Sequence, residues 1–207
     1  MTVPEKGRRL FEQAMRSFTG EGGKQDYATA AKLFEEAAKN GVVGSSKYNL
    51  GVMHKDGLGM PQDLSKAATL FYEAAMKGHP EAQYNLGILY YEGRGVDQDL
   101  EQSCRWFKEA ADRGDLEAMH NLTLSYLEGT GVPADAVQAA AWARKAAEQG
   151  LAGAQSNLGT FYLEGIGVPK DIKQAVHWLQ KAADQGHQDA IDNLGRAMTL
   201  MQAGGSA

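Results

Sequence analysis

The chain has 207 residues, of which 43% are hydrophobic and 23% are charged, and its formal net charge is −5 at pH 7. These values are typical of a folded globular protein and exclude an extensively disordered chain. Charges of both signs are interspersed and acids predominate, so the chain lacks the basic stripe of a duplex nucleic-acid binder and we expect no nucleic-acid partner.

The amino-terminal segment carries no recognisable targeting signal. Residues 1–9 are polar and charged, and no apolar stretch of signal-peptide length follows them. No segment approaches the run of about 18 apolar residues that a membrane helix needs, so we expect no membrane insertion. The only cysteine, Cys104, excludes internal disulfides and fits a reducing compartment. We therefore expect a cytoplasmic protein, or a periplasmic one if an export signal has been removed.

The first predicted element is a degenerate helix over residues 5–18. Its apolar side chains follow one helical face, and a solenoid needs such a helix to cover the end of its core. These side chains are Leu10, Phe11, Ala14 and Phe18. We assign residues 1–43 to a degenerate amino-terminal unit that acts as a cap.

From residue 44 the sequence repeats with a constant spacing of 36 residues. One aspartate marks each copy: Asp63, Asp99, Asp135 and Asp171. A constant period of this length indicates stacked supersecondary units. We therefore predict a single solenoid domain over residues 1–201 and a flexible tail over 202–207. Its full repeats are 44–79, 80–115, 116–151 and 152–187, followed by a half repeat over 188–201.

The first helix of each repeat is represented by residues 81–92. Ala82, Leu86 and Leu89 recur at helical spacing, and Gly93 can adopt the left-handed conformation that ends a helix. A Gly-x-Gly loop follows this helix in every repeat. Phosphate-binding glycine loops follow a strand, and no strand is predicted here, so we interpret the loop as two tight turns.

The second helix of each repeat is predicted to begin at the repeated aspartate. Its carboxylate can accept hydrogen bonds from the free amides at the helix start. A glutamine three residues later, as at Gln102, predicts a capping box. Trp106, Trp142 and Trp178 occupy one equivalent position of this helix. We interpret this aromatic stripe as core packing, and we predict no cofactor.

The repeated motif resembles the Sel1-like repeat, a relative of the tetratricopeptide repeat. The resemblance covers residues 44–187 and rests on this pattern: Ala82-x-x-x-Leu86-Gly87-x-x-Tyr90-x-x-Gly93-x-Gly95-Val96-x-x-Asp99, then Trp106-x-x-x-Ala110-Ala111-x-x-Gly114. It implies an all-α fold, a right-handed α/α superhelical solenoid of antiparallel helix pairs with about 11 helices. It also implies an adaptor in protein complexes, in bacteria often at the envelope or in signalling, that binds along a concave face lined by the first helices.

If the first helices sit as in tetratricopeptide units, several of their positions face that concave surface. The mixture of aromatic, aliphatic and polar groups there suits a peptide or protein better than a small polar metabolite. The asparagine in every first helix either contacts the partner, as in tetratricopeptide domains that clamp carboxylates, or bonds a neighbouring loop or helix. The predicted partner-binding residues are Tyr48, Asn49, Tyr84, Asn85, Ile88, Tyr91, His120, Asn121, Leu124, Asn157 and Thr160.

Two further surfaces are predicted from charge and hydropathy. An acid ends each first helix, where the helix dipole makes negative charge mildly unfavourable. These acids, Asp56, Glu92, Glu128 and Glu164, form either an acidic groove edge that favours a basic partner segment or a merely solvated edge. In the half repeat, no second helix covers the apolar stripe of Ile191, Met198 and Met201. This stripe predicts docking to a partner or a homodimer.

No catalytic or metal-binding pattern is found. The five histidines do not pair with other ligands at zinc spacing, and no serine is followed three residues later by lysine. The sequence therefore predicts a non-enzymatic scaffold that binds a protein or peptide segment. The alternative is a binder or hydrolase of cell-wall or β-lactam compounds of the cysteine-rich Sel1-like type, which the single cysteine disfavours.

Overall fold

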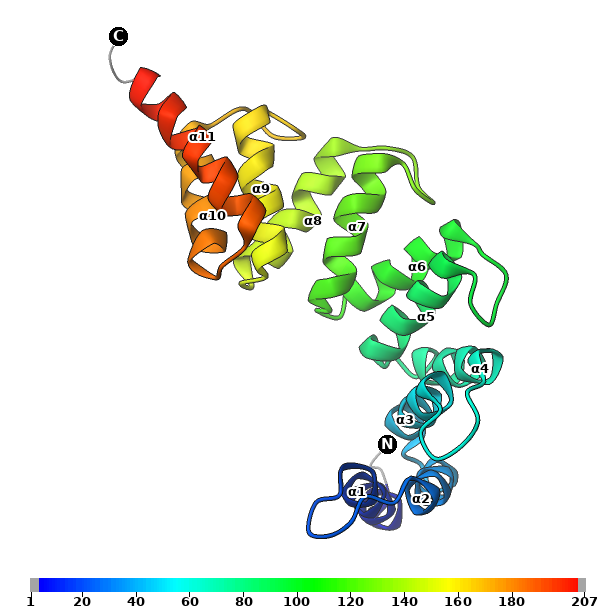
Figure 1. Cartoon of the computed structure of the whole chain (residues 1–207). Coiled ribbons are helices and arrows are strands. Elements are labelled where there is room, and N and C mark those ends of the chain that lie inside the picture. Colours follow the sequence, from blue (N-terminus) through cyan, green and yellow to red (C-terminus); the bar gives the residue numbers. More distant parts are fainter. Residues whose placement is uncertain (1–3, 205–207) are drawn as a thin grey trace. The chain divides into compact units, whose positions relative to one another are not determined.

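The computed structural model describes residues 4–204 (Figure 1). This part of the chain forms eleven α-helices and no strand, which confirms the predicted all-α repeat fold. The helices are α1 (Glu5–Thr19), α2 (Tyr27–Lys39), α3 (Val43–Asp56), α4 (Leu64–Ala75), α5 (Pro80–Glu92), α6 (Leu100–Ala111), α7 (Leu116–Glu128), α8 (Ala136–Glu148), α9 (Ala152–Glu164), α10 (Ile172–Asp184) and α11 (Gln188–Gly204).

The contacts between Cα atoms divide the chain into two compact units, one ending at Arg113 and one beginning at Gly114. In the first unit α1 packs on α2, α3 on α4 and α5 on α6, and α2 and α4 also contact the helix that follows each of them. In the second unit α7 packs on α8 and α9 on α10, while α11 contacts both α9 and α10. The single domain expected over residues 1–201 stays a prediction.

A glycine in the first helix lets the two helices of a pair approach closely. A Cβ atom on Gly87 would lie 2.6 Å from the ring of Phe107, and one on Gly51 would lie 2.7 Å from the ring of Phe71. Both rings are buried, so each fills the space that its glycine leaves open. The helix tolerates glycine here, at a cost of about 1 kcal/mol relative to alanine, because the pair gains a buried aromatic ring.

The Gly-x-Gly loops make two different contacts. Gly93 ends α5 with a φ of 67°, and its N–H donates to the carbonyl of Leu89. Gly95 has a φ of 77°, and a Cβ atom there would lie 2.4 Å from the backbone of Leu64, at the start of α4. The first glycine therefore caps a helix, and the second lets the loop touch the preceding helix pair. Gly59 against Tyr27 and Gly167 against Ala136 repeat the second contact.

The repeated aspartates are the N-caps of the second helices, as predicted. The carboxylate of Asp99 accepts from the amide of Gln102 at 2.9 Å, and that of Asp63 from the amide of Lys66 at 2.8 Å. The capping box differs from the expectation, because the N–H of Asp99 donates to the carbonyl of Tyr90, nine residues earlier. This bond joins the end of the loop to the first helix, so the glutamine is not required for it.

Core positions follow the predicted helical faces. Trp142 and Trp178 are buried, whereas Trp106 is half-buried at the edge of the core. Cys104 is buried and forms no disulfide bond within the described residues. The last helix continues to Gly204, three residues beyond the expected end, and the remaining residues of the expected tail, 205–207, lie outside the described part of the chain.

Candidate partner-binding surface

In the first unit, the predicted tyrosines of α3 and α5 pack partly against the core. The ring of Tyr48 stacks on His79 at 4.6 Å with an interplanar angle of 20°. The ring of Tyr84 lies 5.9 Å from that of Phe107. Both tyrosines are half-buried, so each has a structural contact and an accessible portion.

Tyr91 and Ile88 complete the predicted residues of α5. Tyr91 is 46% exposed, and Ile88 is half-buried. Tyr91 lies one residue before the end of α5 and is absent from the hydrophobic cluster to which Tyr90 contributes. A large aromatic side chain with this exposure is available to a partner.

In the second unit, His120 on α7 lies near His187, which precedes α11. A Cβ atom on Gly153 would be 3.6 Å from His120 and 3.9 Å from His187, so both rings flank this point of α9. Burial lowers the pKa of His120, the nearby Glu117 raises it, and His187 lowers it further. His120 is therefore held towards its neutral form.

The asparagines that recur in the first helices form hydrogen bonds mainly within their own helices. The side-chain amides donate to the carbonyl four residues earlier: Asn49 to Ser45 at 2.8 Å, Asn85 to Glu81 at 2.7 Å and Asn121 to Glu117 at 2.9 Å. Asn157 is half-buried. Each of these three bonds occupies one of the two N–H donors of the amide within its own helix. Contact of these asparagines with a partner stays a prediction.

At the carboxyl end, α11 bonds two of the predicted surface positions of α9. Asn193 donates to the hydroxyl of Thr160 at 3.2 Å, and Arg196 pairs with Glu164 at 2.9 Å. Leu124, the remaining predicted residue of this unit, is half-buried on α7. Thr160 and Glu164 therefore contribute to the packing of the last helix.

All four predicted acids are exposed, but three have a nearby cation. Glu92 pairs with Arg94 at 3.1 Å, and Asp56 lies 3.5 Å from Lys55. Glu164 pairs with Arg196, and Glu128 accepts a long hydrogen bond of 3.5 Å from Thr130. The local cations weaken the acidic field that a basic partner segment would meet.

The predicted apolar stripe lies exposed on α11. Ile191, Met198 and Met201 are 44%, 42% and 41% exposed, and Leu200, which the sequence interpretation did not include, is 45% exposed. A homodimer through this stripe stays a prediction. Light scattering on the protein and on its Met198→Glu and Met201→Glu variants tests it.

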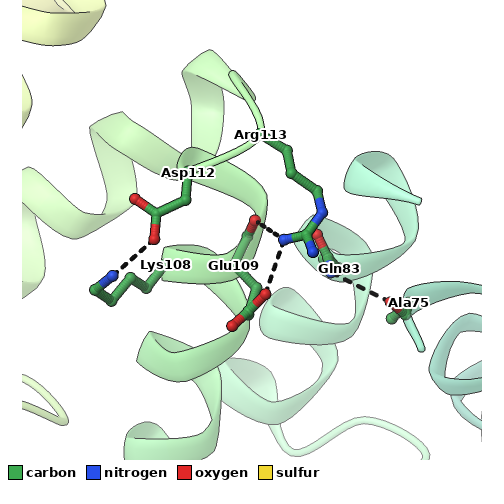
Figure 2. A network of polar contacts seen from close by, with 6 residues as sticks. All are labelled: Ala75, Gln83, Lys108, Glu109, Asp112 and Arg113. Atoms are coloured by element: carbon green, nitrogen blue, oxygen red, sulfur yellow. Dashed lines mark hydrogen bonds and ion pairs between the residues drawn. The ribbon is translucent and has the colours of Figure 1, made fainter. Parts of the chain in front are cut away.

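A buried glutamine and a set of surface ion pairs were not anticipated (Figure 2). Gln83 on α5 is 1% exposed, and its side-chain amide donates to the carbonyl of Ala75 at the end of α4. Arg113 bonds both the side chain and the carbonyl of Glu109 beside it. Gln155, at the equivalent position two repeats later, bonds Ala147 in the same way, and this shared glutamine is the signal that could have identified Gln83. Both glutamines join one helix pair to the next.

The described residues contain no group of three or more His, Cys, Asp or Glu side chains placed to hold a metal ion. None of the helices within residues 4–204 combines the length and the apolar character needed to span a membrane.

Comparison with known proteins gives the family. The Sel1 repeat model matches residues 14–42, 44–79, 80–115, 116–151 and 152–187. A search of curated proteins found none with significant similarity to this chain. Among solved structures, c5321 of uropathogenic Escherichia coli, a protective antigen with an SLR fold, is 36% identical with a TM-score of 0.86; the match covers 91% of this chain and 40% of that chain.

A Sel1 repeat protein from Oxalobacter formigenes is 26% identical with a TM-score of 0.81, and the match covers 86% of this chain and 73% of that one. The immunity protein Pa5087 from Pseudomonas aeruginosa shares the fold, at 19% identity and a TM-score of 0.54, over 92% of this chain and 70% of that one. The chain thus spans less than half of the c5321 chain and most of the other two. Its repeats, their register and these similarities together show that the chain belongs to the Sel1 repeat family.

Proposed function

We propose that this chain is an interaction scaffold whose first helices hold a segment of a partner protein. Sel1 repeat proteins are generally protein-interaction scaffolds, and their fold is typically non-catalytic. The observation that carries the proposal is Tyr91, a large aromatic side chain that is 46% exposed on a first helix. Tyrosine is enriched in protein interfaces because it provides apolar area and a polar hydroxyl at a low cost in conformational entropy.

The partner segment would extend from Tyr91 onto the accessible parts of Ile88 and Tyr84. Ile88 lies three residues before Tyr91 and Tyr84 lies seven before it, a spacing that places them near one stripe of α5. Tyr84 is fixed by its contact with Phe107, so it can bind without a large loss of side-chain freedom. Asn85 donates within its helix, which leaves its carbonyl oxygen as the group that can accept from a partner.

The test compares two tyrosines of nearly equal exposure. Tyr72 on the second helix α4 is 48% exposed and serves as the control for Tyr91. The protein, its Tyr91→Ala variant and its Tyr72→Ala variant are immobilised, and proteins captured from the native organism are quantified by mass spectrometry. We expect Tyr91→Ala to reduce capture of the partner by about tenfold, as truncation of an interface hot spot does, while Tyr72→Ala retains it.

A second pair of substitutions, Tyr84→Ala with Asn85→Ala, extends the test along α5. Equal capture by all variants, or loss of capture with Tyr72→Ala alone, would contradict binding along the first helices. Circular dichroism melts of each variant separate a loss of binding from a loss of folding, because Tyr84 also contacts the core.

A further inference from the structure

A cavity of about 330 Å³ lies in the first unit between α2, α3 and α4. Its lining combines three lysines and a histidine with aliphatic side chains. The lining residues are Glu35, Ala38, Lys39, Val43, Lys47, Leu50, His54, Lys66 and Leu70. A volume of this size falls within the lower range of small-molecule sites, which is about 300–1,000 Å³.

All three lysines depart from what the other repeats carry at the same positions. Lys66 corresponds to Gln102, Gln138 and Gln174, and Lys47 corresponds to Gln83, Met119 and Gln155. Lys39 corresponds to Met76, and in the later repeats to Asp112, Glu148 and Asp184. Repeat packing therefore does not require a lysine at any of these positions. The three departures converge on one cavity although they come from three different helices.

The next helix pair carries two aromatic side chains at the equivalent place. There Tyr72 and Trp106 pack edge to face at 5.9 Å. The corresponding residues around the cavity are Glu35 and Leu70, and neither supplies a ring. In the second unit the guanidinium of Arg144 donates to the hydroxyl of Tyr162 at 2.8 Å, at positions that correspond to Glu35 and His54. A pocket of about 350 Å³ also lies beside Tyr72, at the equivalent place of that next pair. The lysines of the lining, and not the open space alone, therefore distinguish the cavity.

The cavity also carries positive charge that the protein does not neutralise. Lys47 pairs with Glu73 at 2.8 Å, but no carboxylate among residues 4–204 lies within ion-pair distance of Lys39 or Lys66. Glu35 is the one acid in the lining, so the lysines outnumber it. The Nδ1 atom of His54 is buried and has no hydrogen-bond partner within the described residues. A bound anion would pair with the ammonium groups of Lys39 and Lys66.

We propose that this cavity binds a small organic anion. Its phosphate or carboxylate group lies among Lys39, Lys47 and Lys66, and its short apolar part lies on Leu50 and Leu70, which are each 4% exposed. Lysine ammonium groups act as point charges and suit either anion. The site is distinct from the partner-binding surface, because it includes the second helices α2 and α4 and none of the residues proposed there.

The test measures binding of phenyl phosphate and benzoate to the full chain by isothermal titration calorimetry, with benzyl alcohol as the uncharged analogue. We expect at least one of the anions to bind with a Kd of about 1 mM or lower and benzyl alcohol to bind at least tenfold more weakly. The two probes distinguish a phosphate from a carboxylate ligand. Absence of measurable binding by both anions, or equal binding of benzyl alcohol, overturns the proposal.

Three variants use residues that the fold already accepts at equivalent positions. Lys66→Gln is expected to weaken anion binding by about tenfold or more, whereas Lys77→Gln, at a lysine outside the cavity, leaves it unchanged. Glu35→Tyr with Leu70→Trp restores the aromatic pair of the next repeat and is expected to abolish binding while the thermal melt stays cooperative. Binding that survives in this filled variant, or that falls equally with Lys77→Gln, places the anion elsewhere and overturns the proposal.

Discussion

The helix pairs α5–α6 and α7–α8 fill the space between their two helices in opposite ways. In α5–α6, Gly87 on the first helix faces the buried ring of Phe107 on the second. In α7–α8, the equivalent positions hold Thr123 and Ala143, and both are fully buried. The bulk has moved from the second helix to the first, and the hydroxyl of Thr123 is satisfied by the carbonyl of Met119 at 2.9 Å.

This difference shows that the glycine of the repeated Asn-Leu-Gly triplet has to match the side chain that faces it from the second helix of the pair. Thr123, the one departure from the Asn-Leu-Gly triplet, is accompanied by a small residue across the pair. At a third pair the motif glycine, Gly159, faces Leu179, which is intermediate in size between phenylalanine and alanine. The two positions therefore vary together, with a small residue at one of them in every pair, although the combined size of the two side chains differs among the pairs.

The largest expected effect comes from emptying the space beside Gly87. Phe107→Ala should lower the free energy of unfolding by about 3–5 kcal/mol, because a fully buried ring is removed and the backbones cannot collapse further. Phe107→Leu is the matched control, since leucine occupies the equivalent position beside Gly159 and should cost markedly less. Urea denaturation followed by circular dichroism measures both. Equal losses for the two variants would contradict a packing role.

Overfilling the same space is expected to have the next largest effect. Gly87→Thr should cost about 1–3 kcal/mol, because its Cβ atom would lie only 2.6 Å from the ring of Phe107. Combined with Phe107→Ala, it recreates the Thr123–Ala143 arrangement within α5–α6. The double variant should then lose less stability than the sum of the two single variants. Strict additivity in this double-mutant cycle would show that the two positions do not compensate each other.

A smaller difference is expected at the caps of the second helices. The carboxylate of Asp135 accepts from the amides of Val137 and Gln138, whereas that of Asp99 accepts from Gln102 alone. Each Asp→Ala change should cost about 1 kcal/mol, with the larger loss at Asp135. Thermal melts of Asp99→Ala and Asp135→Ala check the order. Asp→Asn variants, which keep a capping oxygen, should retain most of the stability.

The smallest expected effect is a dependence on pH. Burial lowers the pKa of His79, at the start of α5, although Glu81 raises it, and burial likewise lowers that of His120 on α7. The unfolded chain then binds the proton more readily. The stabilisation is complete above about pH 6.5, the ordinary pKa of histidine, and is lost as the pH falls towards the lower folded value.

Substitution of these histidines should reduce that dependence. Between about pH 7.5 and about pH 5.5, the Tm of the native protein should fall further than that of His79→Gln or His120→Gln. Scanning calorimetry at a series of pH values gives the comparison. A decrease of the same size in all three proteins would assign the pH dependence to other groups.

Local chemistry explains why most of the fold could be predicted from the sequence. The helix end at Gly93 and the helix start at Asp99 depend on one residue and its neighbours, so their signals are visible in the chain. The partner of Gly87 was not predicted, because it depends on how two helices cross. The bond from Asp99 to Tyr90 was missed for a related reason, since it depends on the path of the whole loop.

The surfaces were less predictable than the core. Tyr91 was placed on the partner-binding surface by analogy with tetratricopeptide units; it is 46% exposed, and its contact with a partner stays a prediction. The pairing of Glu164 with Arg196 could not be foreseen, because the two residues lie on different helices. Lys39, Lys47 and Lys66 each resemble ordinary surface lysines in the sequence. Only the packing of α2, α3 and α4 brings them to one cavity.

The reciprocal sizes of Gly87–Phe107 and Thr123–Ala143 also bear on how such a gene can evolve. Recombination between repeats that exchanges both helices of a pair keeps each side chain with its partner. A crossover between the two helices would join Gly87 to Ala143, leaving a void, or Thr123 to Phe107, forcing an overlap. Viable duplications, deletions and exchanges should therefore have their breakpoints between helix pairs, so that each pair is gained, lost or exchanged as a whole.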